Sequence, residues 1–279
     1  MRRQVKGEAV ARELLPGENV ALLKELHLLT RDGNLNADSL RKLKQVNHLV
    51  RLLEPAVADV LARFGDPVIV DCGAGKGYLG FVLYELFLRP AGKGRLIALE
   101  SRPELARAAR ERAARLGYDR IEFVEAEIAA APVPPRVHLV TALHACDTAT
   151  DDALVLAVRA NADHVAVVPC CQAEVARQLE RKKDAAPELA ALFDHAWHRR
   201  EFGSHLTNVA RALALEARGY KVTVTELAGW EHSLKNELLL GRKLRARDAA
   251  AEERLRALLL ATGACPKVAR DLGLAPTTC

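Results

Sequence analysis

The chain has 279 residues, with 41 Lys or Arg against 36 Asp or Glu, and a formal net charge of +5. This mild basicity permits a nucleic-acid partner without requiring one, and the length allows one large α/β domain with an appendage. No apolar run approaches the roughly 18 residues of a membrane span. The N-terminus lacks a signal-peptide core, and the six cysteines are too irregular for a secreted disulfide framework, so we expect a cytoplasmic protein.

The first 65 residues are predicted to be helical. Apolar residues recur at spacings of three and four from Leu43 to Val60, which forms one apolar stripe. A turn at 32–34 separates this helix from an earlier one around residues 18–29, and Pro55 is expected to kink or divide it. We predict a helical N-terminal appendage over 1–65, followed by one domain over 66–279. Four basic residues lie in the appendage: Arg41, Lys42, Lys44 and Arg51.

From residue 67, short apolar runs alternate with helical segments. Strands that are apolar on both sides and alternate with helices indicate a parallel sheet covered on both faces. The runs are 68–72, 95–100, 121–125, 137–143 and 164–169. The third crossover, 129–136, contains three prolines and is predicted to be mostly loop.

Two more strands, 220–226 and 236–241, close the predicted sheet. About ten residues join them, too few for a helical crossover, so we expect them to pair antiparallel. A helix over 249–262 follows. The fold class is therefore α/β with a mostly parallel sheet.

The end of the first strand carries the sequence VIVDCGAGKGY, residues 68–78. Asp71 is followed by glycines at alternate positions, Gly73, Gly75 and Gly77, which lets a ligand approach the main chain closely. A dinucleotide fingerprint needs a glycine where this chain has Tyr78, and no Lys-Ser or Lys-Thr pair makes a phosphate loop. The pattern favours the S-adenosylmethionine (SAM) loop over a NAD site.

Acids at three strand ends suit the same cofactor. Asp71 would lie near the amino group, Glu100 could accept both ribose hydroxyls, and Glu127 could accept the adenine amino proton. The carboxyl edge of an open α/β sheet is where such ligands bind. The plainer alternatives are a strand-end cap for Glu100 and a solvated loop acid for Glu127.

The acceptor is expected beside the ends of strands four and five, which read LHACDTATD (143–151) and PCCQ (169–172). His144 and Asp147 are candidate general bases, since a base can remove a proton from a hydroxyl or amide acceptor. Asp147 could instead cap the next helix.

The cysteines of these segments allow two further interpretations. Cys170 or Cys171 could act as a nucleophile toward a pyrimidine ring, or both could pack in the core. A zinc set with His144 and Cys146 has poor spacing, so we expect no metal.

The turn between the last two strands reads GWEHSLKNE and projects from the same edge. His232, Lys235 and Asn236 are candidate substrate contacts at the mouth of the cleft. The alternative is an ordinary exposed hairpin turn.

Together, DCGAGKGYL, LHACDTATD, VPCCQ and EHSLKN resemble a group of class I SAM-dependent methyltransferases. The group includes bacterial methyltransferase-domain proteins and eukaryotic methyltransferase-like proteins, and is distantly similar to tRNA 2′-O-methyltransferases. The resemblance covers roughly residues 40–245, including RKLKQVNHLVRLL as a lead-in helix. It implies a Rossmann-like seven-stranded sheet with the last strand antiparallel, which binds SAM through Asp71, Gly73, Gly75, Gly77, Glu100 and Glu127.

The resemblance and the residues together predict a SAM-dependent methyltransferase. We expect a macromolecular acceptor, RNA (tRNA or rRNA) ahead of protein. The alternative is a non-catalytic SAM-binding module that docks RNA or a partner protein, and a NAD oxidoreductase is a third possibility.

Overall fold

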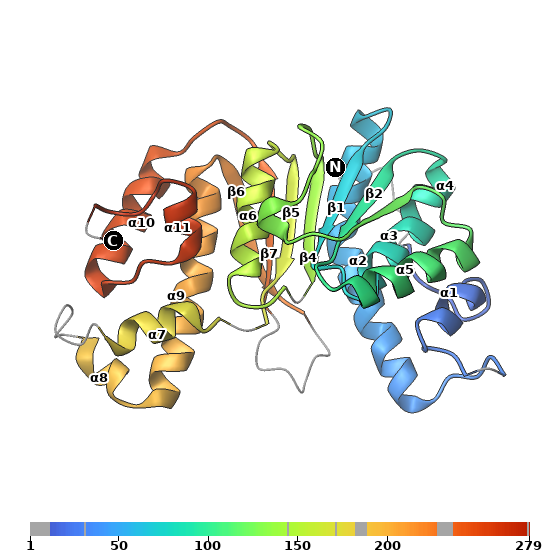
Figure 1. Ribbon diagram of the computed structural model, residues 1–279, viewed down its shortest axis with the longest axis horizontal. Helices are drawn as coiled ribbons and strands as arrows, with labels where there is room; N and C mark the ends of the chain where they lie inside the picture. The colour runs from blue at the N-terminus through green and yellow to red at the C-terminus, as the bar shows by residue number, and fades with distance from the viewer. Residues whose placement is uncertain are drawn as a thin grey trace, which may run out of the picture.

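A computed structural model describes residues 12–30, 32–143, 145–170, 172–181, 189–227, 237–277 and 279. A seven-stranded sheet lies at the centre, with helices packed on both of its faces (Figure 1). The strand order is β3-β2-β1-β4-β5-β7-β6. The strands are β1 (Val68–Cys72), β2 (Arg95–Leu99), β3 (Ile121–Val124), β4 (Leu139–Leu143), β5 (His164–Val168), β6 (Tyr220–Glu226) and β7 (Glu237–Lys243).

The strand pairings confirm the predicted fold class. β1 pairs in parallel with β2 and β4, and the parallel ladder extends to β3 on one side and β5 on the other. β7 runs antiparallel between β5 and β6, as the short connection predicts. Because β1, β4 and β5 are neighbours, the loops that follow them meet at one edge of the sheet.

The two faces of the sheet bury separate cores. Along β1, Val68, Val70 and Cys72 face one core, whereas Ile69 faces the other, as the alternation of a strand requires. The first core packs on α6 (Ala149–Arg159), α7 (Glu174–Glu180), α9 (Ala196–Ala217), α10 (Ala249–Thr262) and α11 (Lys267–Asp271). The second packs on α1 (Val20–Glu25), α2 (Ala37–Arg63), α3 (Tyr78–Leu83), the π-turn η1 (Tyr84–Leu88) and α5 (Pro103–Leu116). Three short elements complete the described chain: α4 (Arg89–Ala91), the 3-10 turn η2 (Ile128–Ala130) and α8 (Ala190–Asp194).

Helix α2 is continuous, so the expectation that Pro55 divides this segment is wrong. Proline removes one backbone hydrogen bond. Leu53 and Val57, on either side of it, are both buried in the same core, which holds the helix together across the proline. The stripe predicted from Leu43 to Val60 therefore packs directly on the sheet side of the molecule. No helix among the residues that the structure describes is long and apolar enough to cross a membrane.

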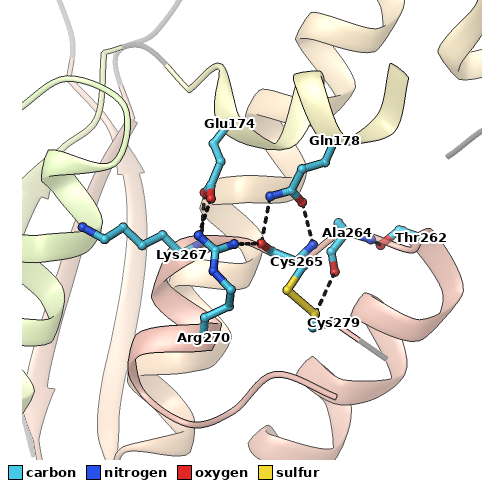
Figure 2. The surroundings of a disulfide bond; sticks show 8 residues. All are labelled: Glu174, Gln178, Thr262, Ala264, Cys265, Lys267, Arg270 and Cys279. Atoms are coloured by element: carbon cyan, nitrogen blue, oxygen red, sulfur yellow. Dashed lines mark hydrogen bonds and ion pairs between the residues drawn. A yellow bond between two sulfur atoms is a disulfide. The ribbon is translucent and has the colours of Figure 1, made fainter. Parts of the chain in front are cut away.

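The C-terminal segment is fastened to α7. Cys265 and Cys279 form a disulfide, a bond that the cysteine spacing did not predict (Figure 2). The side chain of Gln178 makes two hydrogen bonds with the backbone of Cys265, at 2.9 and 2.7 Å, and Arg270 pairs with Glu174 at 2.7 Å. Helix α7 is thus held to the C-terminal segment through Gln178 and Glu174.

Candidate functional site

The glycines after β1 are required for different reasons. All three have positive φ, 65° at Gly73, 57° at Gly75 and 78° at Gly77, where other residues are strained. A side chain at Gly77 would also meet the Phe81 ring at 2.8 Å, so this glycine lets the loop close onto α3. At Gly75, by contrast, a Cβ would have only the carbonyl oxygen of Gly73 within 4.0 Å. Gly73 and Gly75 therefore present bare peptide.

A cavity of about 490 Å³ lies above this bare peptide. One wall is the glycine loop with Asp71, Tyr78 and Arg102. The opposite wall is α2, which contributes Lys42 and Gln45 together with apolar side chains. Sequence analysis did not predict that α2 lines the site. Its amphipathic stripe reveals a buried side but not what that side faces.

Asp71 lies beneath the loop and is only 2% exposed. Its carboxylate accepts hydrogen bonds from the Thr141 hydroxyl, at 2.8 Å, and from the backbone N–H of Gly80. Burial raises the pKa of Asp71 to about 7, although both hydrogen bonds act in the opposite direction. A positively charged group in the cavity would stabilise the ionised form.

Glu100, at the end of β2, is 4% exposed and lies against the loop. It accepts hydrogen bonds from the Gly75 N–H at 2.8 Å and from the backbone and Nε of Arg102 at 3.0 and 2.8 Å. Burial alone would raise its pKa, but the hydrogen bonds from Arg102 and Gly75 outweigh burial and lower it. Glu100 is therefore an ionised acceptor beside bare peptide, suited to sugar hydroxyls.

Glu127 has a different setting. It precedes η2, and its side chain is exposed, whereas Glu100 is buried against Gly75; neither acid is itself among the residues that line the described cavity. Its role toward adenine stays a prediction.

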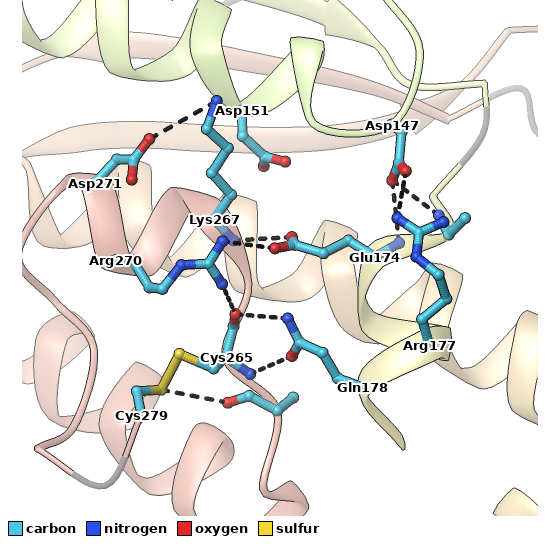
Figure 3. A network of polar contacts seen from close by, with 12 residues as sticks. Asp147, Asp151, Glu174, Arg177, Gln178, Cys265, Lys267, Arg270, Asp271 and Cys279 are labelled. Atoms are coloured by element: carbon cyan, nitrogen blue, oxygen red, sulfur yellow. Dashed lines mark hydrogen bonds and ion pairs between the residues drawn. A yellow bond between two sulfur atoms is a disulfide. The ribbon is translucent and has the colours of Figure 1, made fainter. Parts of the chain in front are cut away.

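Asp147 has a capping geometry, and the helix it caps is not the one expected. With φ at 49°, it turns its carboxylate to the start of α7 (Figure 3). It accepts from the N–H groups of Ala173 and Glu174 at 2.9 and 3.1 Å and pairs with Arg177 at 3.0 Å. Burial would raise its pKa, but these partners outweigh burial and lower it. Such a carboxylate takes up a proton poorly, which favours the cap over the general base.

A buried polar network lies under the same loops, and sequence analysis missed it. Arg211 and Asp151 are 0% and 1% exposed and form a two-point ion pair, with Nε–Oδ1 at 2.8 Å. Arg211 also donates to the backbone carbonyl of Asp147 at 2.8 Å. The available signal was an arginine within the apolar pattern of α9.

The network continues to Gln172, which follows β5, and to Glu237, the first residue of β7. Asn208 accepts from Gln172 at 3.3 Å and donates to Glu237 at 2.7 Å. The residues that follow β4 and β5 and the first residue of β7 are thus attached to one helix, α9.

Two cysteines meet at the ends of β4 and β5. The sulfur atoms of Cys146 and Cys170 lie 3.5 Å apart, with Cys146 exposed. Within the described residues, no group of three His, Cys, Asp or Glu side chains could hold a metal ion. Five predicted site residues lie outside the described residues: His144, Cys171, His232, Lys235 and Asn236.

Comparison with protein families finds a methyltransferase domain in this chain. A family described as "Methyltransferase domain" matches residues 41–178. The chain is 26% identical over 231 residues to a "Glutathione S-transferase C-terminal domain-containing protein" of Xenopus laevis, covering 75% of this chain and 36% of that protein. The human protein with the same description is 25% identical over 232 residues, covering 76% and 35%. The chain spans about a third of the length of these relatives.

Among solved structures, the SAH-bound methyltransferase PaMTH1 of Podospora anserina is similar at 15% identity, with a TM-score of 0.48, over 81% of this chain and 88% of that one. An rRNA methylase from Streptococcus thermophilus has 14% identity and a TM-score of 0.44, covering 70% and 96%.

The residues at the cavity fit SAM. Two buried carboxylates, Asp71 and Glu100, suit a cationic ligand that carries a ribose, and the loop presents backbone without a phosphate cradle. The loop follows the central strand β1 of the seven-stranded sheet and lies within the residues that the family matches. The match over residues 41–178 and the cavity at the glycine loop therefore identify a SAM-dependent methyltransferase domain in this chain.

Proposed function

We propose that this chain transfers the methyl group of SAM to a nucleophilic atom of RNA, tRNA or rRNA. The observation that carries the proposal is that a basic helix start forms one wall of the cofactor cavity. Lys42 lines the cavity, and Arg41 and Lys44 are exposed beside it, against the single acid Asp38. Cations at the rim of a site attract a phosphate backbone and hold it near the reacting atoms.

Methyl transfer mainly requires that the acceptor atom is aligned with the methyl group of SAM. SAM, when bound, supplies a methyl group on a positively charged sulfur, which is already activated for transfer. Asp71 and Glu100 hold the cofactor, while α9 and Asp147 keep the loops after β4 and β5 in place for the acceptor. Placement of this kind contributes up to about 7–11 kcal/mol in favourable cases.

A hydroxyl or amide acceptor also needs a base, for which His144 is our candidate, whereas a ring nitrogen needs none. If Cys170 or Cys171 acts as a nucleophile, the acceptor is a pyrimidine carbon. His232, Lys235 and Asn236 are proposed to touch the acceptor.

The acceptor is identified by labelling. Methyl-labelled SAM and the protein are incubated with RNA and protein fractions from cells that lack the gene. We expect label in RNA, and label confined to protein would overturn the proposal.

The docking surface is tested with charge variants. Arg41→Ala/Lys44→Ala is expected to weaken RNA binding several-fold and to flatten its salt dependence between about 50 and 200 mM. The matched control Arg245→Ala/Arg254→Ala removes two exposed arginines near α10 and should bind as the wild type does. Equal loss in both pairs would show general charge attraction and contradict the proposed surface.

A second candidate function is a SAM-binding module without catalysis. The capping geometry of Asp147 favours it, because that carboxylate is engaged in structure. Production of SAH together with methylated RNA would exclude it.

A further inference from the structure

The cysteine pair at the acceptor edge is not used by the proposed reaction when the acceptor is a hydroxyl or a ring nitrogen. Cys146 follows β4, Cys170 follows β5, and their sulfur atoms are 3.5 Å apart. We propose that Cys146 and Cys170 form a peroxide-reactive dithiol, which hydrogen peroxide or an organic hydroperoxide oxidises to a disulfide.

The two loops already have the proximity that a disulfide needs. A disulfide S–S bond is about 2.05 Å long, so the sulfur atoms must approach by only about 1.5 Å. Asp147, next to Cys146, binds the N–H groups of Ala173 and Glu174, which follow Cys170 in the chain. This clamp keeps the loops together, so the movement falls on the cysteine side chains and not on the sheet.

The surroundings of Cys146 favour its reaction. Its side chain is exposed, so peroxide can reach the sulfur. The guanidinium of Arg102 is close enough to interact electrostatically with Cys146, and the 11-residue helix α6 begins three residues later. The thiolate is the form that attacks peroxide, and a nearby guanidinium attracts that negative charge.

Cys72 provides an internal contrast. It is fully buried behind the glycine loop, and burial raises its pKa. We therefore expect Cys72 to stay reduced while the pair reacts.

The chemistry is balanced in two steps. The Cys146 thiolate attacks one peroxide oxygen, the O–O bond breaks, and after protonation the products are a sulfenic acid and water (an alcohol with an organic hydroperoxide). The Cys170 sulfur then attacks the sulfenic sulfur, the S–O bond breaks, and a second water leaves as the disulfide forms. Both sulfur atoms are oxidised by one electron each, and the two peroxide oxygens are reduced.

The crosslink would act beside the cofactor loop. Ala145, the residue before Cys146, lies 3.6 Å from where a side chain on Gly73 would begin. On the proposed function, which this consequence rests on, a disulfide here stiffens the acceptor entrance and slows methyl transfer, while SAM binding is kept. A reductant should restore the rate.

Peptide mapping tests the crosslink without relying on activity. The protein is treated with hydrogen peroxide, remaining thiols are alkylated, and a digest is analysed by mass spectrometry without reduction. We expect a Cys146–Cys170 linked peptide, lighter by two hydrogens than its parts, that a dithiol reductant removes. Cys146→Ser and Cys170→Ser should each abolish it, and the matched control Cys171→Ser should keep it.

Several outcomes would overturn the proposal. A Cys170–Cys171 or Cys146–Cys171 link, sulfinic acid without any link, or protection by a zinc ion that co-purifies with the protein would each assign another role to these thiols. If the linked peptide forms but methyl transfer is absent before and after reduction, the dithiol stands and the proposed function fails.

Discussion

An acidic residue follows a strand on both the cofactor side and the acceptor side of the sheet edge, but the two residues have different roles. Glu100 and Asp147 each follow a strand, and both are partly or largely buried carboxylates with lowered pKa values. Glu100 lies against the bare peptide of Gly75. Both carboxylates accept hydrogen bonds on both oxygens. The donors to Glu100 are Gly75 and Arg102, which line the cavity, whereas the donors to Asp147 belong to the start of α7. An acid at a strand end thus predicts where a carboxylate will lie, and the position of its hydrogen-bond donors decides whether it faces the cofactor or supports a helix.

The largest expected effect is a loss of stability on the acceptor side of the sheet edge. Arg211→Leu leaves Asp151 buried without its partner, which should lower the free energy of unfolding by about 3–5 kcal/mol. Urea denaturation measures this change. The double variant Arg211→Leu/Asp151→Leu removes both charges and should recover much of the loss. A single variant as stable as the wild type would show that the pair does not hold these loops.

The next largest effect is a loss of SAM affinity on the cofactor side. Glu100→Gln should weaken SAM binding by about 1.5–3 kcal/mol, since a charged acceptor contributes about that much per hydrogen bond. Glu127→Gln, at an exposed acid, is the matched control and should change affinity less. Titration calorimetry compares the two. A larger loss at Glu127 would reverse their roles.

A smaller effect concerns the pH dependence of binding. With its pKa raised to about 7, Asp71 is partly protonated near neutrality, and a cationic ligand prefers the ionised form. SAM affinity should therefore rise with pH and level off above about 7, changing by up to roughly tenfold between one pH unit below and one above. Asp71→Asn should flatten this profile in calorimetry. A wild-type profile without slope would argue against contact between Asp71 and the cation.

The smallest effect tests the cap. Asp147→Asn should cost about 1 kcal/mol of unfolding free energy at neutral pH. Because the folded pKa of Asp147 is lowered, its stabilisation is present above the unfolded pKa of about 3.9 and is lost as pH falls through the folded value. The difference from the wild type should shrink in acid denaturation curves. A difference that persists there would mean that the carboxylate charge contributes nothing.

Sequence analysis correctly predicted features that are set by residues close together in the chain. The glycine loop and the strands are local patterns, and β1, β6 and α10 have the predicted bounds. The partners of Arg211 could not be predicted, because Asp151 lies 60 residues away and either charge alone resembles a surface residue. Sequence analysis left Asp147 as a base or a cap of the next helix, because the donors that bind it come from residues 173–177, at the start of α7. The Cys265–Cys279 bond likewise depends on how the tail folds back onto α7.

Helix α2 has a consequence for any attempt to isolate the catalytic part of the chain. It forms one wall of the cavity through Lys42 and Gln45, and its other end is fixed to the sheet where Asp59 meets His164 at 2.7 Å. A fragment that begins at residue 66 would keep every glycine of the loop, yet its pocket would be open on one side to water. We expect such a fragment to hold the cofactor weakly, and to regain it when the missing helix is added back as a peptide.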